Sequence, residues 1–163
     1  MGDLCEQLRS SLCFAKQLFK NQDVIGVEVG VDEGEHANRI LEWNEVKKLY
    51  LVDVVDNVHD RFKHEGDRVQ FILKPSVEAA KDFKDNSLDF VYIDACHSYQ
   101  AVMEDLNAWY PKVKIGGIIC GHDFRPSDLE IHEGVAQAVT DFFSSLNIEL
   151  YQEDCDFWGI KNV

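Results

Sequence analysis

The sequence has 163 residues, enough for one domain with a sizeable hydrophobic core, and we expect residues 1–163 to form a single domain. Its formal net charge of −14 would repel phosphate backbones and anionic lipids, which argues against nucleic acids and membrane surfaces as partners. No apolar run approaches the ~18 residues of a membrane span. The five cysteines have no CxxC spacing and no signal-like segment begins the chain, which predicts reduced thiols in a cytoplasmic protein.

The hydrophobic pattern predicts helices and strands that alternate along the chain. Residues 3–20 place apolar side chains at helical spacing, so we expect an N-terminal helix within 1–21 and a core domain at 22–163. Apolar runs predict strands within 24–29, 48–55, 69–73, 88–94, 116–124, 148–152 and 156–161. Helical patterns fill 35–44, 76–83, 98–110 and 134–146, with Ser76 as the expected N-cap of its helix.

Strands that alternate with helices are typical of a parallel sheet covered on both faces. The predicted fold class is therefore α/β, with a Rossmann-like, doubly wound sheet. Ligands of such sheets bind beyond the carboxyl ends of the strands. Polar residues follow four of the predicted strands at those ends: Glu28 and Gly30, then Asp53, then Asp94 and His97, then His122 and Asp123.

The loop after the first predicted strand reads E-V-G-V-D-E-G over residues 28–34. This is not the GxGxxG spacing of a dinucleotide loop, and no GK[ST] motif occurs, so an NAD-linked enzyme is a distant alternative. Asp32, Glu33 and Glu35 crowd the loop and would be costly beside a pyrophosphate. A cationic ligand without phosphate, such as S-adenosylmethionine, fits better. Asp53, at the end of the next strand, can accept hydrogen bonds from ribose hydroxyls.

Several segments resemble class I S-adenosylmethionine-dependent methyltransferases. They are the E-x-G-x-x-x-G loop, Asp53, the run "VYIDACHSYQAVMEDLNAWYPKVKIGGIICGHDF" and the following "GVAQAV". The D-x-x-H-x-Y and H-D motifs within them are similar to those of small-molecule O-methyltransferases, including those that methylate antibiotic sugars. The resemblance covers about residues 22–162.

The resemblance implies a seven-stranded sheet whose last strand is antiparallel. It also implies that Glu28, Gly30 and Gly34 line the methionine end of the cofactor and that Asp53 holds its ribose. Asp94 is expected in the cofactor site as well. Residues 74–76, which include Ser76, would lie near the adenine.

An alcohol acceptor must lose a proton during methyl transfer, either to a general base or under the influence of a metal ion. His97 is the predicted base, because an imidazole suits this role near neutral pH and because the resembling sugar methyltransferases carry their base three residues after the equivalent of Asp94. Asp94 joins His97 in the expected catalytic set. Asp94 and Asp123 suit Mg²⁺, and His122, where some magnesium-dependent relatives have an acid, would shift the preference toward Mn²⁺.

The prediction is thus an S-adenosylmethionine-dependent O-methyltransferase for a small hydroxylated acceptor, such as a sugar. Two alternatives stay open: a metal-free N-methyltransferase, and a non-catalytic cofactor-binding domain that works with a partner. Only residues 1 to about 21 precede the first predicted strand, and the loop 124–133 is the only sizeable insertion expected near the site. The pocket is therefore either open or closed by a second subunit, as in a homodimer.

Overall fold

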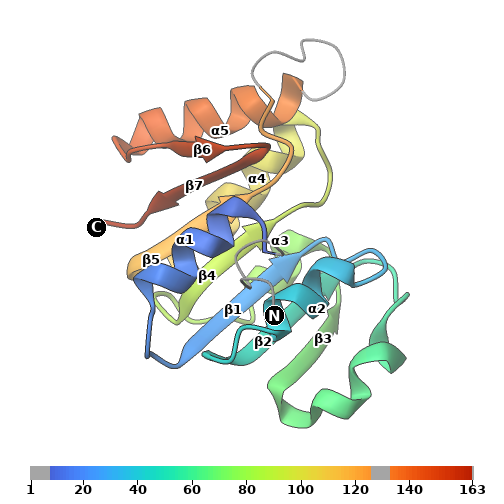
Figure 1. Cartoon of the computed structure of the whole chain (residues 1–163). Coiled ribbons are helices and arrows are strands. Elements are labelled where there is room, and N and C mark those ends of the chain that lie inside the picture. Colours follow the sequence, from blue (N-terminus) through green and yellow to red (C-terminus); the bar gives the residue numbers. More distant parts are fainter. Residues whose placement is uncertain (1–7, 126–132, 163) are drawn as a thin grey trace.

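The computed structural model describes residues 8–125 and 133–162, which build one seven-stranded sheet with helices on both faces (Figure 1). The elements in chain order are α1 (Ser10–Leu18), β1 (Val24–Val29), α2 (Glu35–Leu41), β2 (Val46–Asp53), η2 (His59–Arg68), β3 (Val69–Leu73), α3 (Ser76–Ala80), β4 (Leu88–Ile93), α4 (Tyr99–Trp109), η3 (Tyr110–Lys112), β5 (Val113–Gly121), α5 (Glu133–Leu146), β6 (Tyr151–Glu153) and β7 (Asp156–Ile160). None of the helices in the described ranges is long and apolar enough to cross a membrane.

The strands lie in the order β3-β2-β1-β4-β5-β7-β6. Strands β1 to β5 pair in parallel, whereas β7 is antiparallel to both β5 and β6. This confirms the predicted doubly wound, seven-stranded sheet with an antiparallel last strand. The chain reverses its winding direction between β1 and β4, and that switch point is where sheets of this kind bind ligands.

Two hydrophobic clusters, one on each face of the sheet, hold the layers together. On β4, Phe90 and Tyr92 belong to the cluster that includes residues of α1 and α2. Val91 and Ile93, which alternate with them, belong to the cluster that includes residues of α3, α4 and α5. Because successive strand residues point to opposite faces, an unbroken apolar run is what a strand covered on both sides requires.

Strand β5 begins earlier than the sequence predicts. The predicted strand starts at the glycine pair, at residue 116, yet β5 extends back to Val113. Gly116 has a φ of +82°, and the pairing register with β4 shifts opposite it, between Leu88 and Phe90. The glycines therefore form an irregularity within the strand rather than its start. The carboxyl end is close to the prediction: β5 ends at Gly121 and leaves His122 and Asp123 beyond it.

Helix α1 is fixed to the sheet by polar contacts as well as by packing. Asp156, at the start of β7, accepts hydrogen bonds from the backbone N–H and the hydroxyl of Ser11, at 3.0 and 2.6 Å. The hydroxyl of Tyr92 donates to the other oxygen of Asp156 at 3.1 Å. The helix predicted at 3–20 ends two residues earlier in the structure, at Leu18. Residues 3–7 lie outside the described part of the chain.

Candidate active site

Four neighbouring strands end in polar residues at one edge of the sheet, as the sequence predicts. The order β2-β1-β4-β5 places the ends of these strands side by side. A pocket of about 610 Å³ opens at this edge, and we call it the sheet-edge pocket. Gly30, Asp53, Ser76 and Asp94 all line it, together with four further acidic side chains: Asp32, Glu78, Glu104 and Asp105. The lining is thus strongly acidic, which favours a cationic ligand over a pyrophosphate.

The backbone of the loop after β1 packs directly against the backbone at the end of β4, with no room for a side chain between them. Gly30 has a φ of +83°, and a Cβ atom added there would lie 2.0 Å from the carbonyl oxygen of Asp94. Only glycine allows so close an approach in this conformation. The loop ends at Gly34, which has a φ of +75° and caps the start of α2. Gly34 packs toward Phe62 and does not line the sheet-edge pocket.

Asp53 shapes the same loop. Its Oδ2 accepts hydrogen bonds from the backbone N–H groups of Val31 and Asp32, at 2.8 and 3.2 Å, and its Oδ1 accepts one from Val55 at 3.0 Å. Burial alone would raise the pKa of Asp53, but these backbone donors outweigh it and hold the pKa below its ordinary value. Asp53 therefore presents an ionised carboxylate in the pocket.

Glu28 lies apart from the sheet-edge pocket. Its side chain is buried on the α2 side, where its Oε1 lies 2.7 Å from Nδ1 of His36. Burial raises the pKa of Glu28, while the hydrogen bond with His36 opposes the shift. Within the described residues, neither Oε2 of Glu28 nor Nε2 of His36 has a hydrogen-bond partner. The predicted contact of Glu28 with the methionine end of a cofactor stays a prediction.

Ser76 lies in the sheet-edge pocket, but it does not cap its helix. The N-cap of α3 is Pro75, and no side chain caps the helix there. The Ser76 hydroxyl instead accepts a hydrogen bond from the indole of Trp109 at 2.8 Å and bonds to Asp105. Burial raises the pKa of Asp105, and the hydrogen bond from Ser76 opposes part of this rise. The N-cap prediction was wrong because proline already fixes the start of the helix and Trp109, 33 residues away, engages the hydroxyl.

Asp94, His97 and Asp123 meet beyond the ends of β4 and β5. Nε2 of His97 lies 3.1 Å from Oδ2 of Asp123 and 3.6 Å from Oδ1 of Asp94. One ligand-type atom from each of the three residues lies within 4.8 Å of the others, so the group could hold a metal ion. Asp123 is largely buried, whereas 38% of the His97 side chain is exposed, so the imidazole contacts the carboxylates and is also accessible to solvent.

His122 lies beside Asp123, outside the group of three possible metal ligands. Its Nδ1 lies 3.3 Å from Oδ1 of Asp123, whereas Nε2 of His97 lies 3.1 Å from Oδ2. Arg125 approaches Oδ1 of Asp123 at 3.5 Å. The group of three possible ligands in the described ranges contains His97 in place of His122. A role for His122 as a metal ligand stays a prediction.

Two residues of this site were missed in the sequence analysis. Arg9, at the start of α1, donates from Nη1 to Oδ2 of Asp94 and to the hydroxyl of Tyr92, both at 2.8 Å. His36 lies against the ring of Tyr92, with ring centroids 4.4 Å apart. Arg9 stands 85 positions from Asp94 in the sequence. No local motif marks such a pair, and only the position of α1 on the sheet reveals it.

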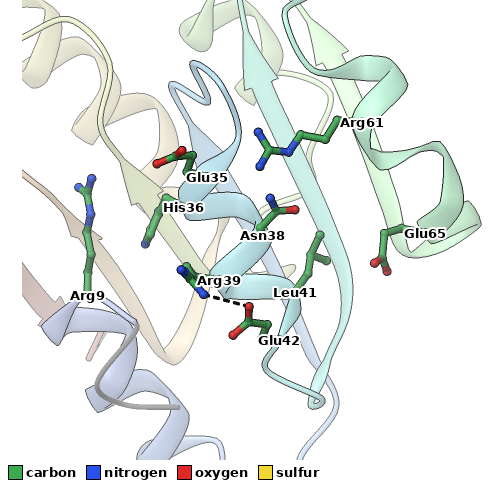
Figure 2. Close-up of a pocket in the computed structure, with 9 residues that line it drawn as sticks. All are labelled: Arg9, Glu35, His36, Asn38, Arg39, Leu41, Glu42, Arg61 and Glu65. Carbon is green, nitrogen blue, oxygen red and sulfur yellow. Dashed lines mark hydrogen bonds and ion pairs between the residues drawn. The ribbon is translucent and has the colours of Figure 1, made fainter. Parts of the chain in front are cut away.

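Arg9 and His36 also line a second pocket of about 650 Å³, which we call the α2 pocket (Figure 2). It runs over α2 between the start of α1 and η2, and its remaining lining residues are Glu35, Asn38, Arg39, Leu41, Glu42, Arg61 and Glu65. Figure 2 shows the guanidinium of Arg9 extended to the level of His36 and Glu35, near the start of α2. The α2 pocket thus reaches the residue that contacts Asp94.

Comparison with known proteins gives the family. The methyltransferase domain family matches residues 10–124, more than half of the chain. A curated relative, the uncharacterized protein R132 of Acanthamoeba polyphaga mimivirus, is 29% identical over 120 residues, which are 66% of this chain and 54% of the relative. The chain therefore spans about half the length of the curated relative that it matches.

Two solved structures have the same fold. The MycE methyltransferase of the mycinamycin biosynthetic pathway, in complex with Mg, SAH and mycinamycin VI, superposes with a TM-score of 0.71 at 17% identity, over 90% of this chain and 47% of MycE. The 1,6-didemethyltoxoflavin-N1-methyltransferase of Burkholderia thailandensis, with its substrate and S-adenosylhomocysteine bound, gives a TM-score of 0.69 at 12% identity, over 94% of this chain and 79% of that one. The chain belongs to the methyltransferase domain family and has the class I S-adenosylmethionine-dependent methyltransferase fold.

Proposed function

We propose that this chain transfers a methyl group from S-adenosylmethionine to a hydroxyl oxygen of a small acceptor. The observation that carries the proposal is the contact of His97 with Asp123 and Asp94, because Asp94 also lines the sheet-edge pocket. Asp94 lies beside the proposed base and also lines the proposed cofactor pocket. An acceptor hydroxyl at His97 would therefore lie close to the methyl donor. Such positioning supplies much of the rate of a displacement reaction.

The sheet-edge pocket suits S-adenosylmethionine in the charge of its lining residues and in the glycine loop beside it. Its acidic lining complements the sulfonium and ammonium groups, and the glycine loop leaves backbone where a side chain would block the approach. Asp53 would hold the ribose, Gly30 and Asp94 would border the methionine end, and Ser76 would lie near the adenine. The sulfonium of the bound cofactor supplies the methyl group.

His97 would accept the hydroxyl proton at Nδ1. When Asp123 accepts the proton of Nε2, the lone pair of the neutral imidazole is on Nδ1, and the carboxylate fixes this tautomer. The imidazolium that forms would have both Asp123 and Asp94 beside its Nε2, and both negative charges would stabilise it. A neutral amine acceptor, by comparison, already has a nucleophilic lone pair and does not need a base to remove a proton before it accepts the methyl group. A base held by two carboxylates therefore favours an oxygen acceptor over a nitrogen acceptor.

A divalent metal is the second way to activate the hydroxyl, and Asp94 and Asp123 would be its ligands. Oxygen ligands suit Mg²⁺, and a nitrogen ligand from His97 or His122 would favour Mn²⁺. If a metal is required, we expect EDTA to abolish methyl transfer and added Mg²⁺ or Mn²⁺ to restore it. Measurement of methyl transfer before and after chelation checks this. Activity that is indifferent to EDTA would contradict metal assistance and leave His97 as the activating group.

The first test of the proposed function is calorimetric titration of the protein with S-adenosylmethionine and, separately, with NAD⁺, each with and without Mg²⁺. We expect S-adenosylmethionine to bind with a micromolar dissociation constant, worth about 8 kcal/mol, and NAD⁺ not to bind. Absence of binding by S-adenosylmethionine would overturn the proposal. Binding without turnover on any hydroxylated acceptor would favour the alternative of a cofactor-binding domain that works with a partner.

A further inference from the structure

Arg9 occupies the N-cap position of α1, but its side chain does not cap the helix. It crosses instead to the end of β4, where Nη1 donates to Oδ2 of Asp94 and to the hydroxyl of Tyr92. The guanidinium carbon also lies 5.6 Å from the centre of the Tyr92 ring. A guanidinium held by three contacts has a defined direction, which is the condition for selective recognition of a ligand.

The anchor of Arg9 is itself fixed. Tyr92 donates to Asp156, and Asp156 accepts two hydrogen bonds from Ser11, two residues after Arg9. This chain of bonds ties the start of α1 to β4 and β7. The position of the guanidinium therefore depends on buried, satisfied groups and not on a mobile side chain alone, so a ligand would meet a preorganised partner.

Only one nitrogen of the Arg9 guanidinium is engaged by the described residues. Both of its hydrogen bonds leave from Nη1, so Nε and Nη2 make none to residues 8–125 or 133–162. Since 32% of the side chain is exposed, a ligand can reach the group. Nε–H and one Nη2–H point the same way and match the two oxygens of a carboxylate. Nε and Nη2 of Arg9 can therefore donate a pair of hydrogen bonds to a planar anion.

Arg9 also stands between the two pockets. It lines the α2 pocket, and its partner Asp94 lines the sheet-edge pocket. A molecule in the α2 pocket that touches Arg9 would have its neighbouring groups close to Asp94 and His97. Arg39 lines the α2 pocket too, but it pairs with Glu42, one turn further along the chain (Figure 2). Arg9 is the arginine of this pocket that contacts Asp94, and we call Asp94, His97 and Asp123 together the cluster.

The charge balance at this place differs from that of the whole chain. The protein carries a net charge of −14, yet each carboxylate of the cluster faces an arginine: Asp94 faces Arg9, and Asp123 faces Arg125 at 3.5 Å. The two guanidinium charges balance the two carboxylate charges. An anionic acceptor would therefore not be repelled at the cluster, although most of the protein surface would repel it.

We propose that Arg9 binds a carboxylate of the acceptor through Nε and Nη2, so that the acceptor is a small hydroxy acid rather than a neutral alcohol. The inference rests on the proposed methyl transfer and narrows its substrate class. A carboxylate on Arg9 would hold a hydroxyl of the same molecule toward His97. Arg9 is a specificity-determining residue in this account, and His97 remains the base.

The test compares hydroxy acids with their amides on protein saturated with S-adenosylhomocysteine. The probes are three pairs that differ in skeleton: D-glucuronate and D-glucuronamide, salicylate and salicylamide, lactate and lactamide. Binding is followed through the ¹⁵Nε resonance of Arg9, which is assigned by its loss in Arg9→Lys. We expect at least one acid to shift this resonance and to bind about 10- to 100-fold more tightly than its amide, the range of a charge-assisted, bidentate pair.

The variants separate recognition from structure. Arg9→Gln should reduce the preference for the acid over its amide to about 2-fold or less. The uncharged glutamine side chain cannot replace the two charge-assisted hydrogen bonds of the guanidinium. The matched control is Arg39→Gln, which removes an arginine of the same pocket and should keep the preference. Binding of S-adenosylhomocysteine by both variants verifies the fold.

Two results would overturn the inference. One is that no acid of the panel shifts the Arg9 resonance or binds better than its amide. The other is that the preference survives in Arg9→Gln, which would assign it to other groups. Failure of the wild-type protein to bind S-adenosylhomocysteine would instead contradict the proposed function itself, so the two failures are distinguishable.

Discussion

Replacement of His97 by alanine should lower the turnover number of methyl transfer by ~10²-fold or more and leave the affinity for S-adenosylmethionine unchanged. The reason lies in the geometry: the imidazole contacts Asp94 and Asp123 beyond the strand ends and does not line the sheet-edge pocket. Loss of a general base removes stabilisation of the transition state, while the cofactor keeps its contacts. Single-turnover kinetics and calorimetric titration of the same variant check the two halves of this prediction.

The control for His97→Ala is His64→Ala, because His64 is an exposed imidazole on η2 that pairs with Glu65 at 3.3 Å, away from the strand ends. We expect this variant to behave as the wild-type protein does. A second comparison is His122→Ala. A loss that appears in His122→Ala but not in His97→Ala would contradict the assignment of the base and favour His122 as the group that matters.

Most of the sheet could be predicted from the sequence, because its strands are short apolar runs between polar turns. β1 and β3 have the predicted bounds, and β4 ends one residue before its predicted end. The exceptions have local causes. β5 contains a glycine irregularity that resembles a turn, and η2 has a polar, largely exposed sequence without an apolar repeat. A hydrophobic pattern indicates which side chains are buried, so it does not reveal a helix or turn that buries few apolar side chains.

The candidate site could be predicted only where it follows strand ends. Asp53 is the last residue of β2, Asp94 directly follows β4, and Asp123 lies two residues beyond β5. The parallel sheet brings these strand ends together. The partners of these residues could not be predicted. Arg9 reaches Asp94 and Tyr92 from 85 and 83 residues away, and His36 meets Glu28 from the far side of the glycine loop. Such contacts depend on how helices sit on the sheet, and one sequence contains no spacing that marks them.

Asp53 illustrates how the structure adds a second role to a predicted one. The sequence suggested a carboxylate that holds the ribose of a cofactor. The structure shows the same carboxylate bound to the backbone N–H groups of Val31, Asp32 and Val55. Val54 is a fourth backbone donor to this carboxylate, so a ribose hydroxyl would share one of its oxygens with a backbone N–H group or replace that group. Asp53 would then order the glycine loop and bind the cofactor with the same group.

This double role predicts that Asp53→Ala weakens the binding of S-adenosylmethionine by about 10²-fold while the turnover number at saturating cofactor stays within about 3-fold of the wild-type value. The loss combines a charge-assisted hydrogen bond to the ribose, about 1.5–3 kcal/mol, with backbone donors left without their acceptor. Asp53→Asn should lose less than Asp53→Ala, because its amide oxygen can still accept from Val31 or Asp32. Calorimetric titration gives the affinities, and initial rates at saturating cofactor give the turnover numbers.

The control must separate the hydrogen bonds of Asp53 from its charge. Asp56→Asn serves this purpose, because Asp56 is an exposed carboxylate three residues further along and does not line the sheet-edge pocket. If cofactor affinity fell equally in Asp56→Asn and Asp53→Asn, a general loss of negative charge would explain both. A fall confined to position 53, with Asn intermediate between Asp and Ala, is the result expected when the oxygens at that position, and not the charge alone, support cofactor binding.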